Sequence, residues 1–193
     1  MSPLFDLRGR TALITGSVRG IGYSLPEGLA VAGANVIING RQQTAVDEAV
    51  AKLKAAGHCA EGVVFDVVDE EAVTRAFASL DARDVAVDIL INNAGIQFRK
   101  PMVELEVADW QRVIDTNLTG AFIVGREAAK RMIPRNRGKI INIGSLTSEA
   151  ARATVAPYTA AKGGIKMLTR SMAAEWAKHN IQANAIGPGY ILT

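Results

Sequence analysis

The chain has 193 residues, of which 49% are hydrophobic and 21% charged, and it carries a net charge of +3 at pH 7. This composition is typical of one globular domain over residues 1–193 and excludes an intrinsically disordered chain. The charges are scattered, no apolar run reaches the length of a membrane span, and "MSPLFDLRGR" lacks the apolar run of a signal peptide, so we expect a cytoplasmic protein that binds neither nucleic acid nor membrane.

Short β-branched runs alternate with longer amphipathic segments along the chain. Strands are predicted at residues 11–15, 35–39, 62–66, 88–92, 139–145 and 181–187. Helices are predicted between them, at about 20–33, 42–56, 69–82, 105–133 and 157–179. The strands are almost entirely apolar, as strands buried on both faces are. The pattern predicts an α/β fold: a doubly wound parallel sheet of the Rossmann type, in three α/β/α layers.

The first predicted strand runs directly into a glycine-rich turn, "TGSVRGIG", which opens the first helix. Glycine allows a sharp turn and a close approach of the backbone to a ligand, and the unpaired N–H groups of a helix start suit a pyrophosphate. A tight turn without a ligand is the alternative. The residues expected to touch a dinucleotide here are Gly16, Ser17, Arg19, Gly20, Ile21 and Gly22. Pro26, one turn further on, is expected to distort the helix locally.

The end of the second predicted strand indicates which dinucleotide is bound. An acidic residue usually holds the ribose 2′-hydroxyl of NAD at this place, but here the strand ends with Asn39, and Arg41 follows. A guanidinium binds a 2′-phosphate that a carboxylate would repel, and Arg19 could reach the same phosphate. We therefore predict NADP(H) in preference to NAD(H), the alternative being that Arg41 is a solvent-facing residue.

Other reactive residues give no pattern of a site. The single cysteine, Cys59, is expected to be a partly buried thiol near a loop, and it excludes an intramolecular disulfide. His58 and His179 are far apart and have no neighbours at metal-ligand spacing, so no metal is expected. The basic stretch 130–139 is interpreted as a helix end, where cations are favourable.

Tyr158 and Lys162 stand four residues apart just after Pro157, at a predicted helix start. Residues at this spacing share a helix face. An ammonium ~4 Å from the phenolic oxygen, at an effective dielectric of ~20, favours the phenolate by about 4 kcal/mol. Such a pair could act as an acid–base catalyst near neutral pH. By itself, Y-x-x-x-K also occurs by chance in many helices.

Taken together, the ordered motifs resemble the short-chain dehydrogenase/reductase family from about residue 6 to the end. They are "TGSVRGIG", "NNAG" at 92–95, Asn117, Ser145, the Tyr158/Lys162 pair and "PG" at 188–189. Within the family, the chain is most similar to members that interconvert D-gluconate and 5-dehydro-D-gluconate. The 3-oxoacyl-[acyl-carrier-protein] reductases share much of the same pattern.

The resemblance implies roles for these residues. Tyr158 would exchange a proton with the substrate oxygen, Lys162 would bind the nicotinamide ribose and tune the tyrosine, Ser145 would bond the substrate oxygen, and Asn117 would hold a water that links Lys162 to solvent. Alternatively, Ser145 is only a helix cap. Further cofactor contacts are implied at Asp66, Val67, Asn93, Ala94, Gly95, Pro188, Gly189, Ile191 and Thr193.

For a sugar-acid substrate, Arg99 and Arg152 are candidates to bind the carboxylate, or else are surface charges. Family members usually continue for several tens of residues past "PGYILT", so the C-terminal part of the fold is expected to be missing. The segments 105–133 and 157–179 are apolar on two faces, which suggests a partner subunit, although a missing part of the same chain could also cover the second face. The family resemblance implies a homotetramer, which a contact between these helices would fit. The remaining alternative is an inactive cofactor-binding fragment.

Overall fold

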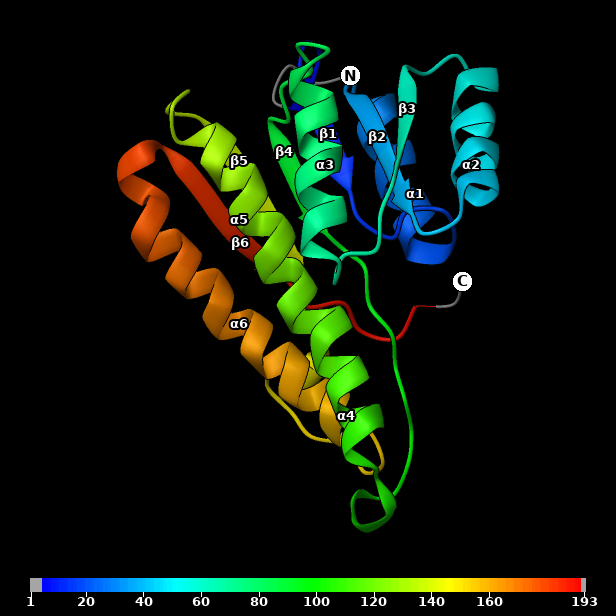
Figure 1. Ribbon diagram of the computed structural model, residues 1–193, viewed down its shortest axis with the longest axis vertical. Coiled ribbons are helices and arrows are strands. Elements are labelled where there is room, and N and C mark those ends of the chain that lie inside the picture. The colour runs from blue at the N-terminus through cyan, green and yellow to red at the C-terminus, as the bar shows by residue number, and fades with distance from the viewer. Residues whose placement is uncertain (1–4, 192–193) are drawn as a thin grey trace.

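The structure, a computed structural model, describes residues 5–191 and is built on one six-stranded parallel sheet (Figure 1). The strands are Thr11–Ile14 (β1), Asn35–Gly40 (β2), Ala60–Val64 (β3), Ile89–Asn92 (β4), Gly138–Ile143 (β5) and Ile181–Ile186 (β6). They lie in the order β3-β2-β1-β4-β5-β6. The order reverses between β1 and β4, and such a switch point opens a crevice at the carboxyl ends of the strands.

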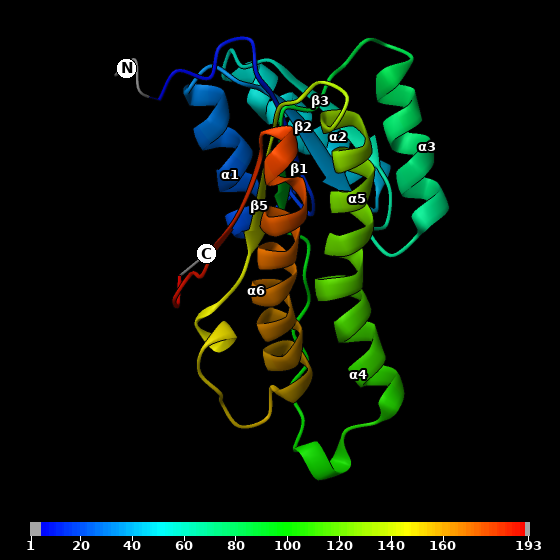
Figure 2. The same ribbon diagram turned by 90° about the vertical axis from the view of Figure 1, so that its left-hand side faces the viewer.

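Helices cover the sheet on both faces, which confirms the predicted doubly wound fold. They are Gly20–Val31 (α1), Gln43–Ala55 (α2), Glu70–Asp81 (α3), Val107–Ile114 (α4), Gly120–Met132 (α5) and Ala156–Trp176 (α6). The pair α1 and α2 packs on one face, whereas α3, α5 and α6 pack on the other (Figures 1 and 2). Figure 2 shows α4–α5 and α6 side by side, extending together beyond the carboxyl edge of the sheet.

Two apolar cores form because successive strand residues point to opposite faces. Leu13 and Ile37 are fully buried in the core under α3, α5 and α6. Ile14 and Ile38, the next residues along, are fully buried in the core under α1 and α2. The near-continuous apolar runs read from the sequence are therefore required by burial on both sides.

The predicted continuous helix 105–133 is wrong in one respect. It begins at Val107 and is interrupted by a π-helical turn, Asp115–Thr119, between α4 and α5. In this turn the Gly120 N–H donates to the Asp115 carbonyl, five residues back. Such turns occur frequently at functional sites, and this one contains Asn117. Pro26, in contrast, is buried within α1, which stays continuous from Gly20 to Val31.

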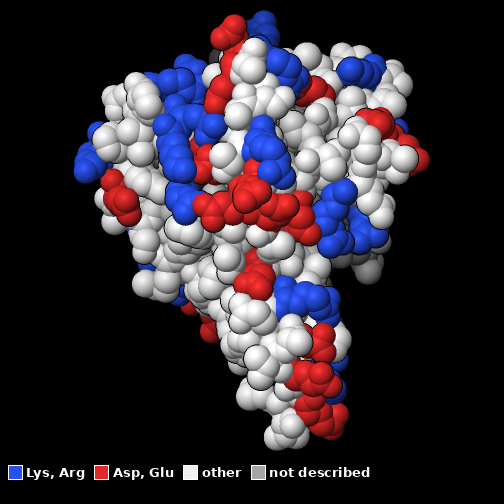
Figure 3. All heavy atoms as spheres, in the orientation of Figure 1, with Lys and Arg blue, Asp and Glu red and all other residues white. Residues whose placement is uncertain are grey.

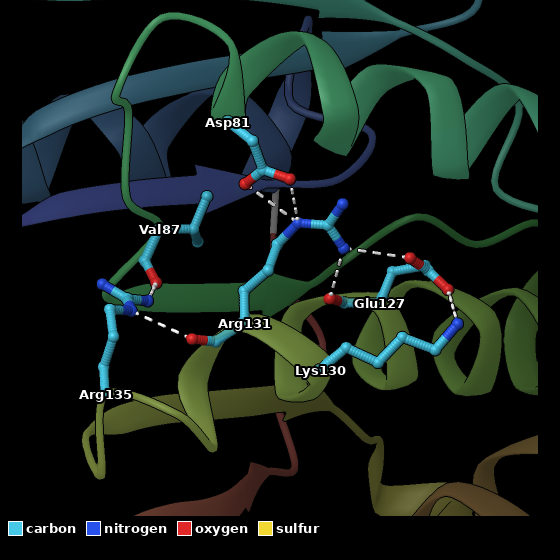
Figure 4. A network of polar contacts seen from close by, with 6 residues as sticks. All are labelled: Asp81, Val87, Glu127, Lys130, Arg131 and Arg135. Atoms are coloured by element: carbon cyan, nitrogen blue, oxygen red, sulfur yellow. Dashed lines mark hydrogen bonds and ion pairs between the residues drawn. The ribbon is translucent and has the colours of Figure 1, made fainter.

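Cations and carboxylates are interspersed on the face of the molecule that Figure 3 shows. The basic stretch 130–139 is largely paired: Arg131 contacts Asp81 and Glu127, Lys130 contacts Glu127 at 2.5 Å, and Arg135 donates to the Val87 carbonyl at 2.6 Å (Figure 4). These contacts tie the end of α5 to α3 and to the start of β4.

Cys59 is exposed, not partly buried as expected, and it lies just before β3, an edge strand of the sheet. Among the described residues, 5–191, no helix is long and apolar enough to cross a membrane, and no cluster of three or more His, Cys, Asp or Glu side chains could hold a metal ion.

Candidate active site

The glycine-rich turn adopts a conformation that other residues rarely take. Gly16 and Gly20 have φ of +61° and +54°, in the left-handed region. A Cβ on Gly16 would lie 2.9 Å from the Ala94 Cα, and one on Gly22 would lie 2.2 Å from the Gly16 carbonyl oxygen. At these two positions the turn therefore has no room for a Cβ, and Gly16 packs directly on the segment after β4.

Side-chain hydrogen bonds hold these two segments together. The Asn93 amide donates to the carbonyls of Thr15 and Gly16, at 3.0 and 2.9 Å. In return, the Thr15 hydroxyl accepts from the backbone N–H groups of Asn93 and Ala94, both at 3.0 Å. The start of α1 is left open to a ligand, since its first turn has no acidic residue and the N-cap Arg19 makes no side-chain capping bond among the described residues.

Asn39 and Ser17 support the turn from beneath. The buried Asn39 side chain accepts from the Gly16 N–H at 3.1 Å and donates to the carbonyls of Val63 and Phe65. The Ser17 hydroxyl donates to the Ile14 carbonyl at 2.8 Å and accepts from the Asn39 N–H at 2.9 Å. Both side chains thus bond backbone groups of the protein, and they contribute to the site by fixing the backbone of the glycine-rich turn.

A cavity of about 830 Å³ opens above this turn at the carboxyl edge of the sheet. Arg19, Arg41 and Asp66 line it. Arg41 lies 3.8 Å from the Asp66 carboxylate and its side chain is 73% exposed, so it is free to turn toward a ligand. Predicted cofactor residues that line the cavity are Gly16, Arg19, Gly22, Asn39, Arg41, Asp66, Val67, Asn93, Ala94 and Gly95. The remaining described ones, Ser17, Gly20, Ile21, Tyr158, Lys162, Pro188, Gly189 and Ile191, lie outside its lining, and Thr193 lies outside the described residues.

Asn117 projects from the π-helical turn toward the loop after β4. Its buried amide nitrogen donates to the carbonyls of Ile96 and Val113, at 2.8 and 2.9 Å. Its Oδ1 is buried and has no hydrogen-bond partner among the described residues. A Cβ on Gly95 would lie 2.5 Å from this oxygen, so glycine is required there. A buried acceptor without a partner is a place where an ordered water is expected.

Ser145 lies two residues beyond the end of β5 and caps the short 3₁₀ turn Leu146–Ser148. Its hydroxyl oxygen accepts from the Thr147 N–H at 3.2 Å, while the Ser148 hydroxyl accepts from the Ser145 N–H at 3.2 Å. The alternative interpretation of Ser145 as a helix cap is thus correct for its hydroxyl oxygen, which acts as the acceptor. Because a hydroxyl also has a proton to donate, the cap leaves Ser145 able to bond a substrate oxygen.

Lys162 and Tyr158 lie together on one face of α6. The Lys162 Nζ is 5.5 Å from the centroid of the Tyr158 ring and donates a 2.6 Å hydrogen bond to the Ile143 carbonyl, at the tip of β5. Only 4% of Lys162 is exposed. Burial lowers the pKa of Lys162 to about 8, so the amine keeps its charge at neutral pH but loses it in mild alkali.

The loop after Ser145 meets the C-terminal segment. The Leu146 N–H donates to the Pro188 carbonyl at 3.3 Å. Arg152 donates to the Tyr190 hydroxyl at 3.0 Å, and its guanidinium lies 5.8 Å from the centroid of that ring. Arg99 is exposed, on the loop that follows "NNAG". Within residues 5–191, Tyr190 orients Arg152, whereas Arg99 has no hydrogen-bond or ion-pair partner.

Three supporting residues were missed from the sequence. Thr15 joins the glycine turn to β4, Ile143 supplies the carbonyl that holds Lys162, and Thr116 lines the cavity from the π-helical turn. A buried threonine at a strand end is a pattern that could have indicated the first. A backbone carbonyl has no sequence signature.

The site and the fold place the chain in a known family. A model described as short chain dehydrogenase matches residues 10–193. The protein belongs to this family.

Three relatives illustrate the similarity. A putative gluconate dehydrogenase from Agrobacterium tumefaciens, known from a crystal structure, is 70% identical with a TM-score of 0.97, over 98% of this chain and 75% of that one. A gluconate 5-dehydrogenase from Burkholderia cenocepacia, solved in complex with NADP and tartrate, is 48% identical with a TM-score of 0.95, over 98% and 74%. A 2-dehydro-3-deoxy-D-gluconate 5-dehydrogenase from Formosa agariphila is 48% identical over 98% of this chain and 72% of its own length.

Proposed function

We propose that this protein is an NADP-dependent oxidoreductase that interconverts D-gluconate and 5-dehydro-D-gluconate. The observation that carries the proposal is the placement of Lys162, buried, bonded to the Ile143 carbonyl at 2.6 Å and lying against the Tyr158 ring. A buried ammonium beside a phenol, next to the loop of Ser145, is an arrangement suited to proton transfer at a substrate alcohol or ketone.

The residues present fit a dinucleotide phosphate. The backbone cradle at Gly16 and Gly22 excludes any Cβ, and the first turn of α1 offers N–H groups and a positive dipole end for the pyrophosphate. Arg19 and Arg41 line the same cavity and would bind the 2′-phosphate. Asp66 and Val67 would contact the adenine, and the segment Asn93–Gly95 would pass along the cofactor. When bound, NADPH supplies the hydride.

The chain's own residues would then handle the proton and orient the substrate. The Tyr158 hydroxyl would give a proton to the ketone oxygen in reduction and take it back in oxidation. Lys162 would bind the nicotinamide ribose and keep its positive charge near the phenolic oxygen. The free proton of the Ser145 hydroxyl would bond the substrate oxygen. Asn117 Oδ1, the buried acceptor without a described partner, would hold a water on the path from Lys162 to solvent. Pro188, Gly189, Ile191 and Thr193 would complete the cofactor's surroundings.

For the substrate carboxylate we propose Arg152, oriented by Tyr190, with Arg99 as a second candidate. Two relatives named for gluconate, of which one was solved with tartrate, support a hydroxy acid as substrate.

The decisive experiment is turnover of NADPH with 5-dehydro-D-gluconate, followed by loss of NADPH absorbance, in wild type and Tyr158→Phe. We expect Tyr158→Phe to lose activity and to keep its affinity for NADPH. Wild-type turnover in this variant would refute the mechanism. Parallel assays with 2-dehydro-3-deoxy-D-gluconate and an acetoacetyl thioester separate the sugar-acid proposal from a ketoacyl reductase. No activity with any of them, despite NADPH binding, would favour an inactive cofactor-binding protein.

We further propose that residues 1–193 act as a single cofactor-binding and catalytic unit in the cytoplasm, assembled as a homotetramer through the segments 105–133 and 157–179. Apolar side chains exposed on these segments, Phe122 and Met167 with Val107, support the contact. A light-scattering measurement of mass tests it, and a change to monomer in Phe122→Glu is the expected result.

A further inference from the structure

We infer that Thr169 and Asn142 are positioning residues whose mutual hydrogen bond fixes the axial position of α6 on β5, and thereby holds Lys162 and Tyr158 at the strand tip. The inference rests on the proposed function.

The pair belongs to a buried polar chain that crosses the core from strand to strand to helix. Asn92 on β4 donates to the Asn142 Oδ1 at 2.8 Å. Asn142 on β5 donates to the Thr169 hydroxyl at 2.9 Å, and that hydroxyl donates to the Ile165 carbonyl of α6 at 2.7 Å. Asn142 is fully buried, and Asn92 and Thr169 are each 6% exposed. Buried polar groups are costly unless they are bonded, so these three hydrogen bonds favour one arrangement of the side chains. Among the described residues, the Asn92 Oδ1 atom has no partner of its own.

The donor and acceptor direction of these hydrogen bonds is fixed by the backbone carbonyls at the two ends of the series. The Asn92 amide nitrogen also donates to the Ala121 carbonyl at 3.2 Å, and a carbonyl can only accept, so Asn92 must present its NH₂ group on that side. Asn142 must then present Oδ1 to Asn92 and its own NH₂ to Thr169. Since the last acceptor is the Ile165 carbonyl, position 169 needs a group that both accepts and donates. Only a hydroxyl of this size meets the requirement.

The helix is consequently attached to one strand at two places. Asn142 binds Thr169, and the carbonyl of the next strand residue, Ile143, binds the Lys162 Nζ. Lys162 and Thr169 are seven residues apart, which puts them on the same helix face about 10 Å apart along the axis. Apolar packing is not directional and tolerates small slides, whereas two directional bonds at this separation fix both the slide and the rotation of α6.

The slide of α6 matters because Lys162 and Tyr158 lie about two and three turns before Thr169. Small misplacements of reacting groups cost large factors in rate. Of the two hydrogen bonds that attach α6 to β5, loss of the Thr169 bond would leave that of the Lys162 amine. This amine is also the group that the proposed mechanism uses.

The test compares Thr169→Val with Thr169→Ser. Valine keeps the shape but removes the hydroxyl, whereas serine keeps the hydroxyl and removes a methyl group. For Thr169→Val we expect kcat with NADPH and 5-dehydro-D-gluconate to fall about tenfold or more, a KM change below about threefold, and a shifted pH profile of kcat. For Thr169→Ser we expect wild-type kcat and pH profile within about twofold, with a lower Tm from the small cavity. Equal kinetics in the two variants would overturn the inference.

A triple variant separates positioning from stability. Asn92→Leu/Asn142→Leu/Thr169→Val removes both amides and the hydroxyl, so neither amide donor is left without an acceptor, and folding is expected to recover relative to Thr169→Val. If the pair positions the helix, the triple variant stays about tenfold slow although it is stable. Wild-type kcat in the triple variant would contradict the inference.

A readout without turnover distinguishes failure of this inference from failure of the proposed function. Loss of activity in the wild type on every substrate would count against the function only. The pH dependence of unfolding in the cofactor-free protein still reports the burial of Lys162. We expect Thr169→Ser to keep the rise in stability above pH about 8 and Thr169→Val to lose part of it. An unchanged rise in Thr169→Val would overturn the positioning role.

Discussion

The Lys162 ammonium donates a 2.6 Å hydrogen bond to the Ile143 carbonyl while only 4% of the lysine is exposed. A single backbone acceptor does not replace the hydration of a charge, so the folded protein holds this proton less tightly than the unfolded chain does.

This relationship predicts an alkaline rise in stability. The pKa of Lys162 falls from its ordinary value of 10.5 to about 8 on folding because of burial. Below pH about 8 both states carry the proton and the cost of burying the charge is constant. Between about 8 and 10.5 the unfolded state binds more protons, so the free energy of unfolding rises with pH. Relative to Lys162→Met, the wild type should gain roughly 3 kcal/mol across this window in urea unfolding.

The control for that prediction is Lys52→Met, at an exposed position of α2. This variant should follow the wild type at every pH. If Lys162→Met also follows the wild type, the lysine is hydrated and its burial is not as described.

Coenzyme choice should depend on Arg41. Removing the guanidinium in Arg41→Ala is expected to weaken NADPH binding about tenfold and to leave NADH binding nearly unchanged, because only the 2′-phosphate distinguishes the two. Fluorescence titration measures both affinities. Arg75→Ala, which removes an exposed guanidinium paired with Glu71 on α3, is the matched control. Equal losses of affinity for NADPH and NADH would show that Arg41 does not bind the 2′-phosphate.

Two glycines of α1 should respond oppositely to alanine. A Cβ on Gly22 would lie 2.2 Å from the Gly16 carbonyl oxygen, so Gly22→Ala should lower the free energy of unfolding by about 1–3 kcal/mol and abolish tight NADPH binding. A Cβ on Gly28 meets nothing within 4 Å, so Gly28→Ala should raise stability by about 0.5–1 kcal/mol and leave binding intact. Calorimetry with and without NADPH tests the pair. Tight NADPH binding in Gly22→Ala would contradict the proposal that the backbone at Gly16 and Gly22 holds the cofactor.

The contacts in Figure 4 predict acid sensitivity. Burial alone would raise the pKa of Glu127, but hydrogen bonds from Lys130 and Arg131 outweigh it and place the pKa below its ordinary value of 4.5. A carboxyl whose pKa is lowered by folding adds stability above 4.5 that is lost as pH falls through the folded value. Glu127→Gln should therefore be less stable than the wild type at neutral pH, and the two should converge in acid.

Urea unfolding at descending pH measures this difference. Glu71→Gln, at an exposed ion pair of α3, should show almost no difference from the wild type at any pH. A constant gap between Glu127→Gln and the wild type would mean that the ion pairs of Glu127 contribute nothing.

Local patterns predicted most of the fold. The apolar runs gave the six strands to within two residues, since burial on both faces leaves an unmistakable composition. The glycine spacing predicted the cradle because glycine adopts the left-handed φ values of Gly16 and Gly20 without steric cost.

What the sequence could not predict depends on contacts between distant segments. The π-helical turn at Asp115–Thr119 has no local composition of its own, and within it Asn117 bonds the carbonyl of Ile96, 21 residues earlier. The role of Asn39 was interpreted from its position at a strand end, whereas its amide is engaged by Gly16, Val63 and Phe65. The Asn142–Thr169 pair joins residues 27 positions apart, and no local sequence pattern indicates it.

The five-residue turn between α4 and α5 also makes chain length critical at this point. Removing one residue from 115–119 would restore regular α-helical winding and swing everything before it, from Val107 onward, about 100° around the helix axis. The amide that now reaches the Ile96 carbonyl would then face elsewhere. Single-residue deletions here should inactivate the protein, whereas exchanges at the exposed Gln111 nearby should be tolerated.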